Sequence, residues 1–147
     1  MTTKPISSNI AESTEEVREL FRNAVLAREK AHCIYSGHKV GAAIRTNTGK
    51  IFSGCNVENS SYGGCICAER TAIVKAVSEV GFLEISDVLV VTDSRDPWPP
   101  CGMCLQVIGE FGKNPNIYFA NVKGNFSLKK FIEIFSNPFR RGFLSSK

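Results

Sequence analysis

The sequence lacks any long apolar run. Its longest uninterrupted apolar stretches, such as residues 88–91, have the length of a β-strand, whereas a membrane-spanning helix needs about 20 apolar residues. The opening residues, MTTKPISS, also lack the apolar core of a secretory signal. We therefore expect a cytoplasmic protein that makes no contact with a membrane.

Glycine and proline are too few for a collagen-like or low-complexity chain, with 12 Gly and 6 Pro among 147 residues. Apolar residues make up 43% of the sequence, which excludes a disordered chain. A chain of this length ordinarily folds as one compact domain and buries about 70% of its unfolded surface. We expect a single domain over residues 1–147, with residues 1–12 flexible.

Charge of one sign is not in large excess either. The 18 Lys and Arg residues and the 14 Asp and Glu residues give a net charge of +4. Residues 121–147 hold six of the basic residues and one acidic residue, so the basic excess belongs to the C-terminal segment. A solvated surface accounts for such a segment, and no RNA-binding or helix-turn-helix motif accompanies it. We do not expect a nucleic-acid partner.

Hydrophobic periodicity and turn residues divide the chain into alternating elements. The pattern predicts helices over residues 14–31, 67–80, 101–111 and 127–135, and strands over residues 39–45, 51–57, 87–92 and 116–120. A capping box at residues 13–16 starts the first helix, and Asn47 and Gly49 supply turn chemistry between the first two strands. This order of elements predicts an α/β fold in three layers whose later strands are parallel.

Histidine is scarce, with only His32 and His38, whereas there are six cysteines. In a chain without a secretory signal, cysteines are expected to be thiols that are available for metal binding or catalysis. Residues 101–104 form a C-x-x-C pattern at the start of a predicted helix. By itself this pattern is compatible with a redox pair, with half of a zinc site or with a structural coincidence.

A third cysteine stands at the start of another predicted helix. Catalytic zinc needs three protein ligands, and both histidines lie far from residues 101–104 in the sequence, so we expect the remaining ligand to be a cysteine. Cys67 can bind the metal while the carboxylate of Glu69 points into the same cavity and moves protons. The helix N-terminus favours the thiolate, and Arg70 can offset the negative charge of three thiolates around Zn²⁺.

The segments CAE at residues 67–69 and PCGMC at residues 100–104 resemble the signature of zinc-dependent nucleoside deaminases. The wider chain is similar to the small homotetrameric cytidine deaminases of the cytidine/deoxycytidylate deaminase superfamily. The similar segments are YS at 35–36, VGAA at 40–43, GCNVENSSY at 54–62, Gln106, EF at 110–111 and residues 134–139. The resemblance implies a three-layer α/β/α fold with a five-stranded mixed sheet, one Zn²⁺ per chain, and a homotetramer whose active sites are shared between subunits.

The resemblance also implies an activity and the residues that perform it. The enzyme would hydrolytically deaminate cytidine and 2′-deoxycytidine to uridine and 2′-deoxyuridine, with release of ammonia, in pyrimidine salvage. Glu69 would be the catalytic residue that carries protons. The implied zinc ligands are Cys67, Cys101 and Cys104, supported by Arg70 and Gln106.

Further residues are implied to bind the nucleoside. They are His38, Asn56, Glu58, Tyr62, Ala68, Pro100 and Phe139. Backbone groups at Ala68 and Pro100 would hold the base, and the carboxylate of Glu58 beside the ribose favours a nucleoside without a phosphate group. Tyr62 and Phe139 match positions that reach toward the active site of a neighbouring subunit.

The sequence departs from the family pattern at His38, at Leu105 and at residues 134–136, which read IFS where the family has LLP. His38 stands where phenylalanine is usual, and its imidazole would stack less extensively on a pyrimidine and add a hydrogen-bonding group. Leu105 stands where arginine is usual. The departure at His38 leaves open an aminohydrolase for a modified or antibiotic cytosine nucleoside, and a non-catalytic zinc protein is a further alternative. We expect Trp98 to pack within the proline-rich loop of residues 93–100.

Overall fold

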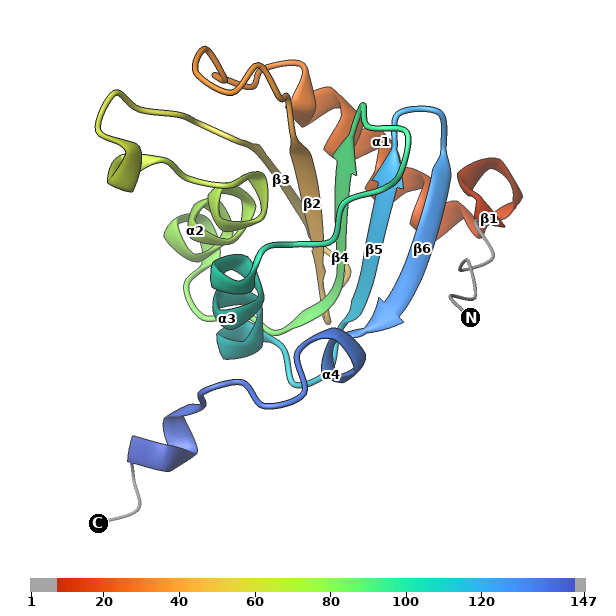
Figure 1. Cartoon of the computed structure of the whole chain (residues 1–147). Helices are drawn as coiled ribbons and strands as arrows, with labels where there is room; N and C mark the ends of the chain where they lie inside the picture. Colours follow the sequence, from red (N-terminus) through yellow and green to blue (C-terminus); the bar gives the residue numbers. More distant parts are fainter. Residues whose placement is uncertain (1–7, 145–147) are drawn as a thin grey trace, which may run out of the picture.

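The computed structural model describes residues 8–144, which form a β-sheet with helices on both faces (Figure 1). The flexible segment expected over residues 1–12 lies partly outside the described residues, because residues 1–7 are not among them. Residues 8–12 form strand β1 (Ser8–Asn9) and the short 3-10 helix η1 (Ile10–Glu12), and Ile10 is buried. Within residues 8–144, no helix combines the length and the apolarity that a bilayer span requires.

The sheet of the described residues has six strands, so the expectation of five is wrong. The strands are β1, β2 (Gly41–Thr46), β3 (Ile51–Cys55), β4 (Ile85–Thr92), β5 (Asn116–Asn121) and β6 (Asn125–Lys130). Their order across the sheet is β1-β6-β5-β4-β2-β3. Strands β4 and β5 run parallel, as expected, and the other neighbouring pairs are antiparallel, so the sheet is mixed.

The helix expected over residues 127–135 is wrong in its first half. Residues 127–130 belong to β6, which forms a hairpin with β5, and the helix α4 is restricted to Phe131–Ile134. Gly124 adopts a φ of 86° in the turn, and Asn121 Oδ1 accepts hydrogen bonds from the backbone N–H groups two and four residues later. This turn chemistry overrides the helical spacing of the apolar residues that follow it.

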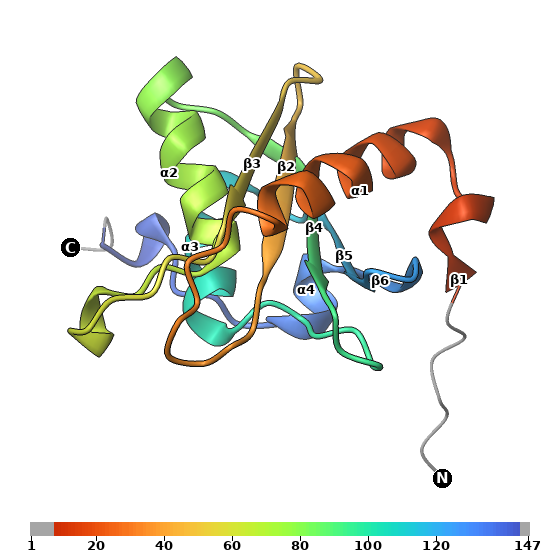
Figure 2. The ribbon, with the colours of Figure 1, turned by 90° about the horizontal axis from the view of Figure 1, so that it is seen from above.

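Helices cover the sheet on both faces, which confirms the three-layer α/β/α arrangement (Figure 2). Helix α1 (Glu15–Arg28) lies on one face, and α2 (Ala68–Val80), α3 (Gly102–Phe111) and α4 lie on the other. Successive side chains of a strand point to opposite faces. Leu89 and Val91 of β4 therefore join the apolar cluster that contains residues of α1, whereas Val88 joins the cluster that contains residues of α2 and α3.

Helix α2 lies very close to strand β3 because β3 has a glycine at the contact. A Cβ atom at Gly54 would lie 2.5 Å from the backbone nitrogen of Ala72 and 2.9 Å from the carbonyl oxygen of Ala68. No other residue leaves room for the backbone of α2 at this distance. The glycine thereby fixes the first turns of α2, which carry the CAE segment, against the sheet.

Candidate active site

Three cysteines converge where helices α2 and α3 begin. Cys67 and Cys101 each precede the first residue of a helix, and Cys104 lies in the first turn of α3. All three Sγ atoms lie within 4.8 Å of one another, and those of Cys67 and Cys101 are 3.9 Å apart. Zn–S bonds of about 2.3 Å in a tetrahedral site place two sulfurs about 3.8 Å apart. The donor set therefore fits a zinc ion, and the structure brings together the three residues predicted as ligands.

Hydrogen bonds separate the pKa values of these thiols. The pKa of Cys67 is lowered to about 5, first because the Cys104 thiol donates a hydrogen bond to it and then because Arg70 lies beside it. The pKa of Cys104 is raised because it is that donor and because it is buried. Arg70 Nη2 lies 3.7 Å from Cys67 Sγ and 3.2 Å from the carbonyl oxygen of Cys65. The arrangement favours a thiolate at the start of α2, which is the form that binds a metal.

Glu69 is the second residue of α2, and only 4% of its surface is exposed. Burial raises the pKa of its carboxyl group to about 7, against the lowering effect of hydrogen bonds and of Arg70. A carboxyl group that titrates near neutral pH can both accept and donate a proton. A buried carboxyl group with such a pKa, beside a cysteine cluster, is typical of a functional site.

A cavity of about 300 Å³ opens beside Glu69 and the cysteines. Its lining residues are Ser36, His38, Val40, Asn56, Cys67, Ala68, Glu69, Val90, Thr92, Trp98, Pro99 and Cys101. Polar groups thus stand on a mostly apolar wall, which is the usual composition of a small-molecule site. Four of the residues predicted from the resemblance, His38, Asn56, Ala68 and Glu69, lie in this wall together with two of the cysteines.

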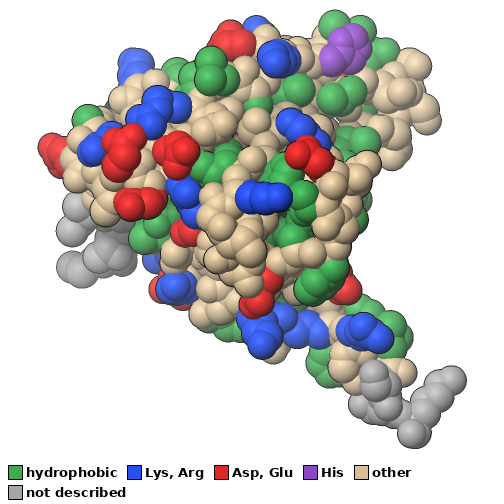
Figure 3. All heavy atoms as spheres, turned by 180° about the vertical axis from the view of Figure 1, so that it is seen from behind, with side chains coloured by type: hydrophobic (Ala, Val, Ile, Leu, Met, Phe, Trp, Pro, Cys, Tyr) green, Lys and Arg blue, Asp and Glu red, His purple; other side chains and the backbone are tan. Residues whose placement is uncertain are grey.

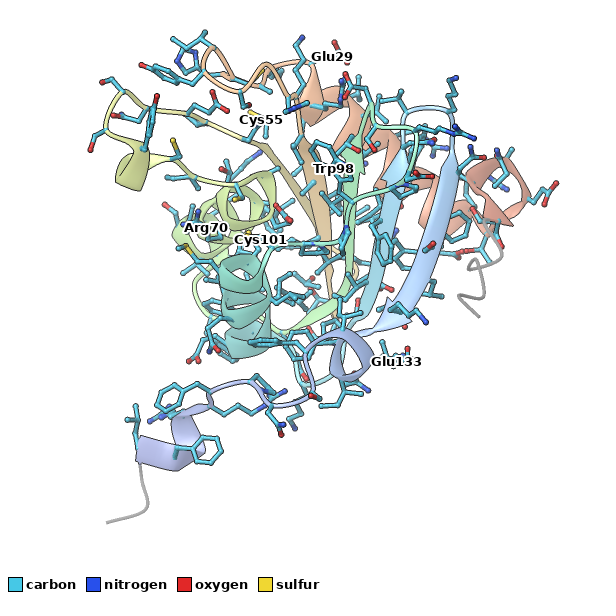
Figure 4. All side chains as sticks on the ribbon, in the orientation of Figure 1. Glu29, Cys55, Arg70, Trp98, Cys101 and Glu133 are labelled. Atoms are coloured by element: carbon cyan, nitrogen blue, oxygen red, sulfur yellow. The ribbon has the colours of Figure 1, made fainter. Side chains whose placement is uncertain are left out.

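Trp98 lies in the cavity wall and not only within its own loop (Figure 4). Its ring meets the ring of His38 edge-on, with centroids 5.2 Å apart and planes at 73°. The two aromatic side chains come from loops that are far apart in the sequence. The expectation of simple loop packing for Trp98 missed this contact, although a tryptophan close before the first cysteine of the C-x-x-C pattern was a usable signal.

Asn56 and Glu58 hold the loop that carries His38. Asn56 Oδ1 accepts a hydrogen bond of 2.8 Å from the backbone N–H of Val40, and Asn56 Nδ2 donates one of 2.8 Å to the carbonyl oxygen of His38. The Glu58 carboxylate accepts bonds from the backbone N–H groups of the YS segment at residues 35–36, at 2.8 and 3.2 Å. The Ser36 side chain and these N–H groups lower the pKa of Glu58. Both side chains therefore shape one wall of the cavity.

Comparison with known proteins accounts for this combination of cysteines, carboxyl group and cavity. The profile of the family described as "Cytidine and deoxycytidylate deaminase zinc-binding region" matches residues 14–120. The chain belongs to this family. It binds zinc accordingly, and the cluster of Cys67, Cys101 and Cys104 is the group of side chains that fits the ion.

Named relatives and a solved structure extend the match. A "Cytidine deaminase" from Sporosarcina psychrophila is 46% identical over 112 residues, which cover 75% of this chain and 81% of the relative. A "Probable cytidine deaminase" from Dictyostelium discoideum is 50% identical over 99 residues, 67% of each chain. The crystal structure of cytidine deaminase from Burkholderia pseudomallei superposes with a TM-score of 0.79 at 41% identity, covering 86% of this chain and 100% of that one.

Other predicted residues of this family member lie at or outside the rim of the cavity. Pro100 is buried between Pro99 and Cys101, both of which line the cavity. Tyr62, on the short 3-10 helix η2 (Tyr62–Gly64), is 73% exposed and meets the ring of Tyr35 edge-on. These placements leave Tyr62 facing solvent in the single chain.

The C-terminal segment is attached to helix α3 by Gln106. Its side-chain amide donates a hydrogen bond of 2.7 Å to the carbonyl oxygen of Phe139 and accepts one of 3.2 Å from the Phe139 N–H. Phe139 is 58% exposed, stacks on Phe143 and borders a separate hollow. Gln106 thus holds Phe139, whereas the resemblance implied support of the zinc ligands. Leu105, at the second departure from the family pattern, is buried in the apolar core.

Proposed function

We propose that this chain catalyses the hydrolytic deamination of cytidine and 2′-deoxycytidine, which yields uridine or 2′-deoxyuridine and ammonia. The observation that carries the proposal is the buried carboxyl group of Glu69 in one cavity with the cysteine cluster. A purely structural zinc site requires neither a cavity nor a buried carboxyl group. Relatives named as cytidine deaminases, at 46% and 50% identity, also favour this substrate over a modified nucleoside.

In this proposal Cys67, Cys101 and Cys104 hold the zinc ion. When bound, zinc acidifies water and so makes hydroxide available near neutral pH. Glu69 accepts the proton that water loses and delivers a proton to N3 of the cytosine ring. After hydroxide has added to C4, Glu69 accepts the proton of the new C4 hydroxyl group and transfers it to the amino group, which leaves as ammonia while the C4 carbonyl of uridine forms. One carboxyl group with a pKa of about 7 suits both directions of transfer.

The nucleoside is held by groups around the same cavity. Backbone groups at Ala68 and Pro100 bind the cytosine, and His38 packs on its ring. Asn56 and Glu58 form hydrogen bonds with the 3′-hydroxyl group of the ribose. The lowered pKa of Glu58 keeps this side chain negatively charged at neutral pH, and a negative charge beside the sugar disfavours a phosphorylated substrate.

The exposed aromatic residues support a homotetramer with shared active sites. Tyr62 and Phe139 are 73% and 58% exposed, which leaves both rings free to contact another subunit. Arg70 supports the cysteine cluster, and Gln106 presents Phe139. We propose a single domain over residues 1–147 that acts in the cytoplasm in pyrimidine salvage. On the face in Figure 3, acidic and basic side chains are interspersed over the upper part, and basic side chains gather at the lower edge.

The test is ammonia and uridine release from purified protein of known zinc content. Cytidine, 2′-deoxycytidine, a cytidine monophosphate and a cytosine nucleoside with a modified base form the substrate panel. Cytidine turnover that falls about 10²- to 10⁴-fold in Glu69→Ala, with zinc retained, supports the proposal. Full zinc content with no turnover of cytidine or 2′-deoxycytidine overturns it.

A further inference from the structure

Arg28, at the end of helix α1, is a buried arginine with three partners. It is 8% exposed. Its Nε donates a hydrogen bond of 3.1 Å to the carbonyl oxygen of Lys39, its Nη2 lies 2.9 Å from Asp93 Oδ2, and its Nη1 lies 3.1 Å from Glu29 Oε1. A buried guanidinium group that is fixed by bonds in several directions keeps its partners at set distances.

Two of the three partners of Arg28 belong to the two loops that bound the cavity. Lys39 directly follows His38, and Asp93 directly follows Thr92, at the start of the loop that carries Trp98. The two loops meet again at the His38–Trp98 ring contact, 5.2 Å between centroids. Arg28 thus ties the loops together at one place, and their aromatic side chains meet at another.

Close packing of α1 against β2 lets the Arg28 side chain extend to both loops. A Cβ atom at Gly41, the first residue of β2, would lie 2.0 Å from the carbonyl oxygen of Ala24 and 2.6 Å from Arg28 Cβ. The last turns of α1 therefore press directly on the start of β2. Among residues 8–144, those that line the cavity do not include Arg28. The guanidinium group acts on the cavity from outside it.

We propose that Arg28 is a positioning residue of the deaminase, which holds the His38 and Trp98 loops at the separation that binds the cytosine ring. The inference rests on the proposed function. Because the two rings contact the base in the ground state and in the transition state alike, loss of the arginine removes uniform binding energy. Loss of Arg28 should therefore raise the KM for cytidine and leave kcat nearly unchanged.

The experiment compares Arg28→Met with Arg45→Met. Arg45 is a matched control because it is a mostly buried arginine that joins β2 to α1, through the carbonyl oxygen of Glu16 at 2.6 Å and Glu19 Oε2 at 3.3 Å, at the end of the strand away from the His38 loop. Both variants should lower the melting temperature. The proposal expects Arg28→Met alone to raise the KM for cytidine about tenfold at a kcat within about twofold of wild type. Arg28→Lys, which keeps the charge, should recover part of the affinity.

A second readout does not depend on turnover. Trp98 is the sole tryptophan of the sequence, so fluorescence reports on its loop directly. Acrylamide should quench Trp98 more strongly in Arg28→Met than in wild type or Arg45→Met. If Arg28→Met does not fold, Asp93→Asn replaces it, because Asp93 is largely exposed and its neutralisation weakens the same contact.

Two results would overturn the proposal. One is unchanged KM and quenching in Arg28→Met, or in Asp93→Asn where that variant is used. The other is an equal change in Arg45→Met, which would reduce Arg28 to a general contribution to stability. A wild-type protein without cytidine turnover would contradict the proposed function and with it the positioning of a cytosine, whereas the quenching comparison would still decide whether Arg28 holds the two loops.

Discussion

The helix starts that carry Cys67, Glu69 and Cys101 differ from the loops that carry His38 and Trp98 in what holds them. The helices are fixed by the apolar core and, for α2, by backbone packing at Gly54. The loops are fixed by a few polar side chains that bond to loop backbone and to Asp93. Groups for chemistry therefore stand on elements that cannot shift without disturbing the core, and the two aromatic rings proposed for recognition stand on loops that polar contacts hold.

This difference between the helix starts and the loops predicts which kinetic constant a variant changes. Changes at the helix starts should affect kcat, and changes in the loops should affect KM. Variants in either region can break that separation.

The largest effect is expected at the cysteine cluster. Cys104→Ala removes a thiol that is fully buried, and the protein should lose its zinc and its cytidine turnover to below detection. Zinc content by mass spectrometry and ammonia release measure the two losses. Cys65→Ala is the control, because Cys65 lies two residues before Cys67 but outside the cluster, and it should keep both properties. Full zinc content in Cys104→Ala would contradict the assignment.

A smaller but still large effect is expected for Glu69→Gln. The substitution keeps the shape of the side chain and removes its ability to carry protons. We expect kcat to fall about 10²- to 10⁴-fold with unchanged zinc content. Binding of cytidine, followed through Trp98 fluorescence, should stay within a few-fold of wild type. Loss of binding in parallel with kcat would show that the helix start also governs recognition, and the division between the two regions would fail.

In the loops, Trp98→Leu should act on affinity. An aromatic pair contributes about 0.5–1.5 kcal/mol beyond its buried area, so the KM for cytidine should rise about 2- to 10-fold at constant kcat. His38→Phe should lower the KM for cytidine, because a phenyl ring stacks on the pyrimidine more extensively than imidazole does. Steady-state kinetics of both variants decide the matter. An equal fall in kcat for the two would place these rings in the chemical step.

The smallest effect concerns pH and Glu58. The pKa of Glu58 in the folded state is lowered, chiefly by a hydrogen bond from the Ser36 side chain. The charge of Glu58 therefore stabilises the fold fully above the unfolded-state pKa of about 4.3. This stabilisation is lost as the pH falls through the lower pKa of the folded state. Protection of the Tyr35 and Ser36 amide hydrogens from exchange should fall in that acidic range. In Glu58→Gln, which cannot ionise, the same protection should not change with pH, and a parallel change there would assign the effect to another group.

Local patterns in the sequence predicted the helix starts but not the contacts of the loops. Cys67 and Glu69 are neighbours in sequence, as are Cys101 and Cys104, and each of these two pairs lies at the start of a helix whose apolar spacing is clear. The meeting of His38 with Trp98, and of Arg28 with Asp93, joins distant parts of the chain. No local period reports such pairs, because they depend on how the whole sheet assembles.

The strands show the same limit. The central strands β4 and β5 were predictable from short apolar runs. Strand β6 was not, because the apolar residues Leu128, Phe131, Ile132 and Phe135 follow the i, i+3, i+4, i+7 spacing of a helix, and the last three residues of β6 are exposed. Its identity as a strand comes from pairing with β5 through the turn at Gly124. In a half-exposed strand, pairing with a neighbouring strand outweighs the intrinsic preference of the residues.

The cysteine cluster also changes how the chain is connected. Cys67 and Cys101 are 34 residues apart in sequence, and α2 and β4 lie between them. An ion held by both sulfurs closes this stretch into a ring, much as a disulfide would, and ring closure restricts the conformations that an opened chain can sample. The protein thereby obtains a reversible cross-link without oxidising any thiol, and its melting temperature becomes a function of the free zinc concentration.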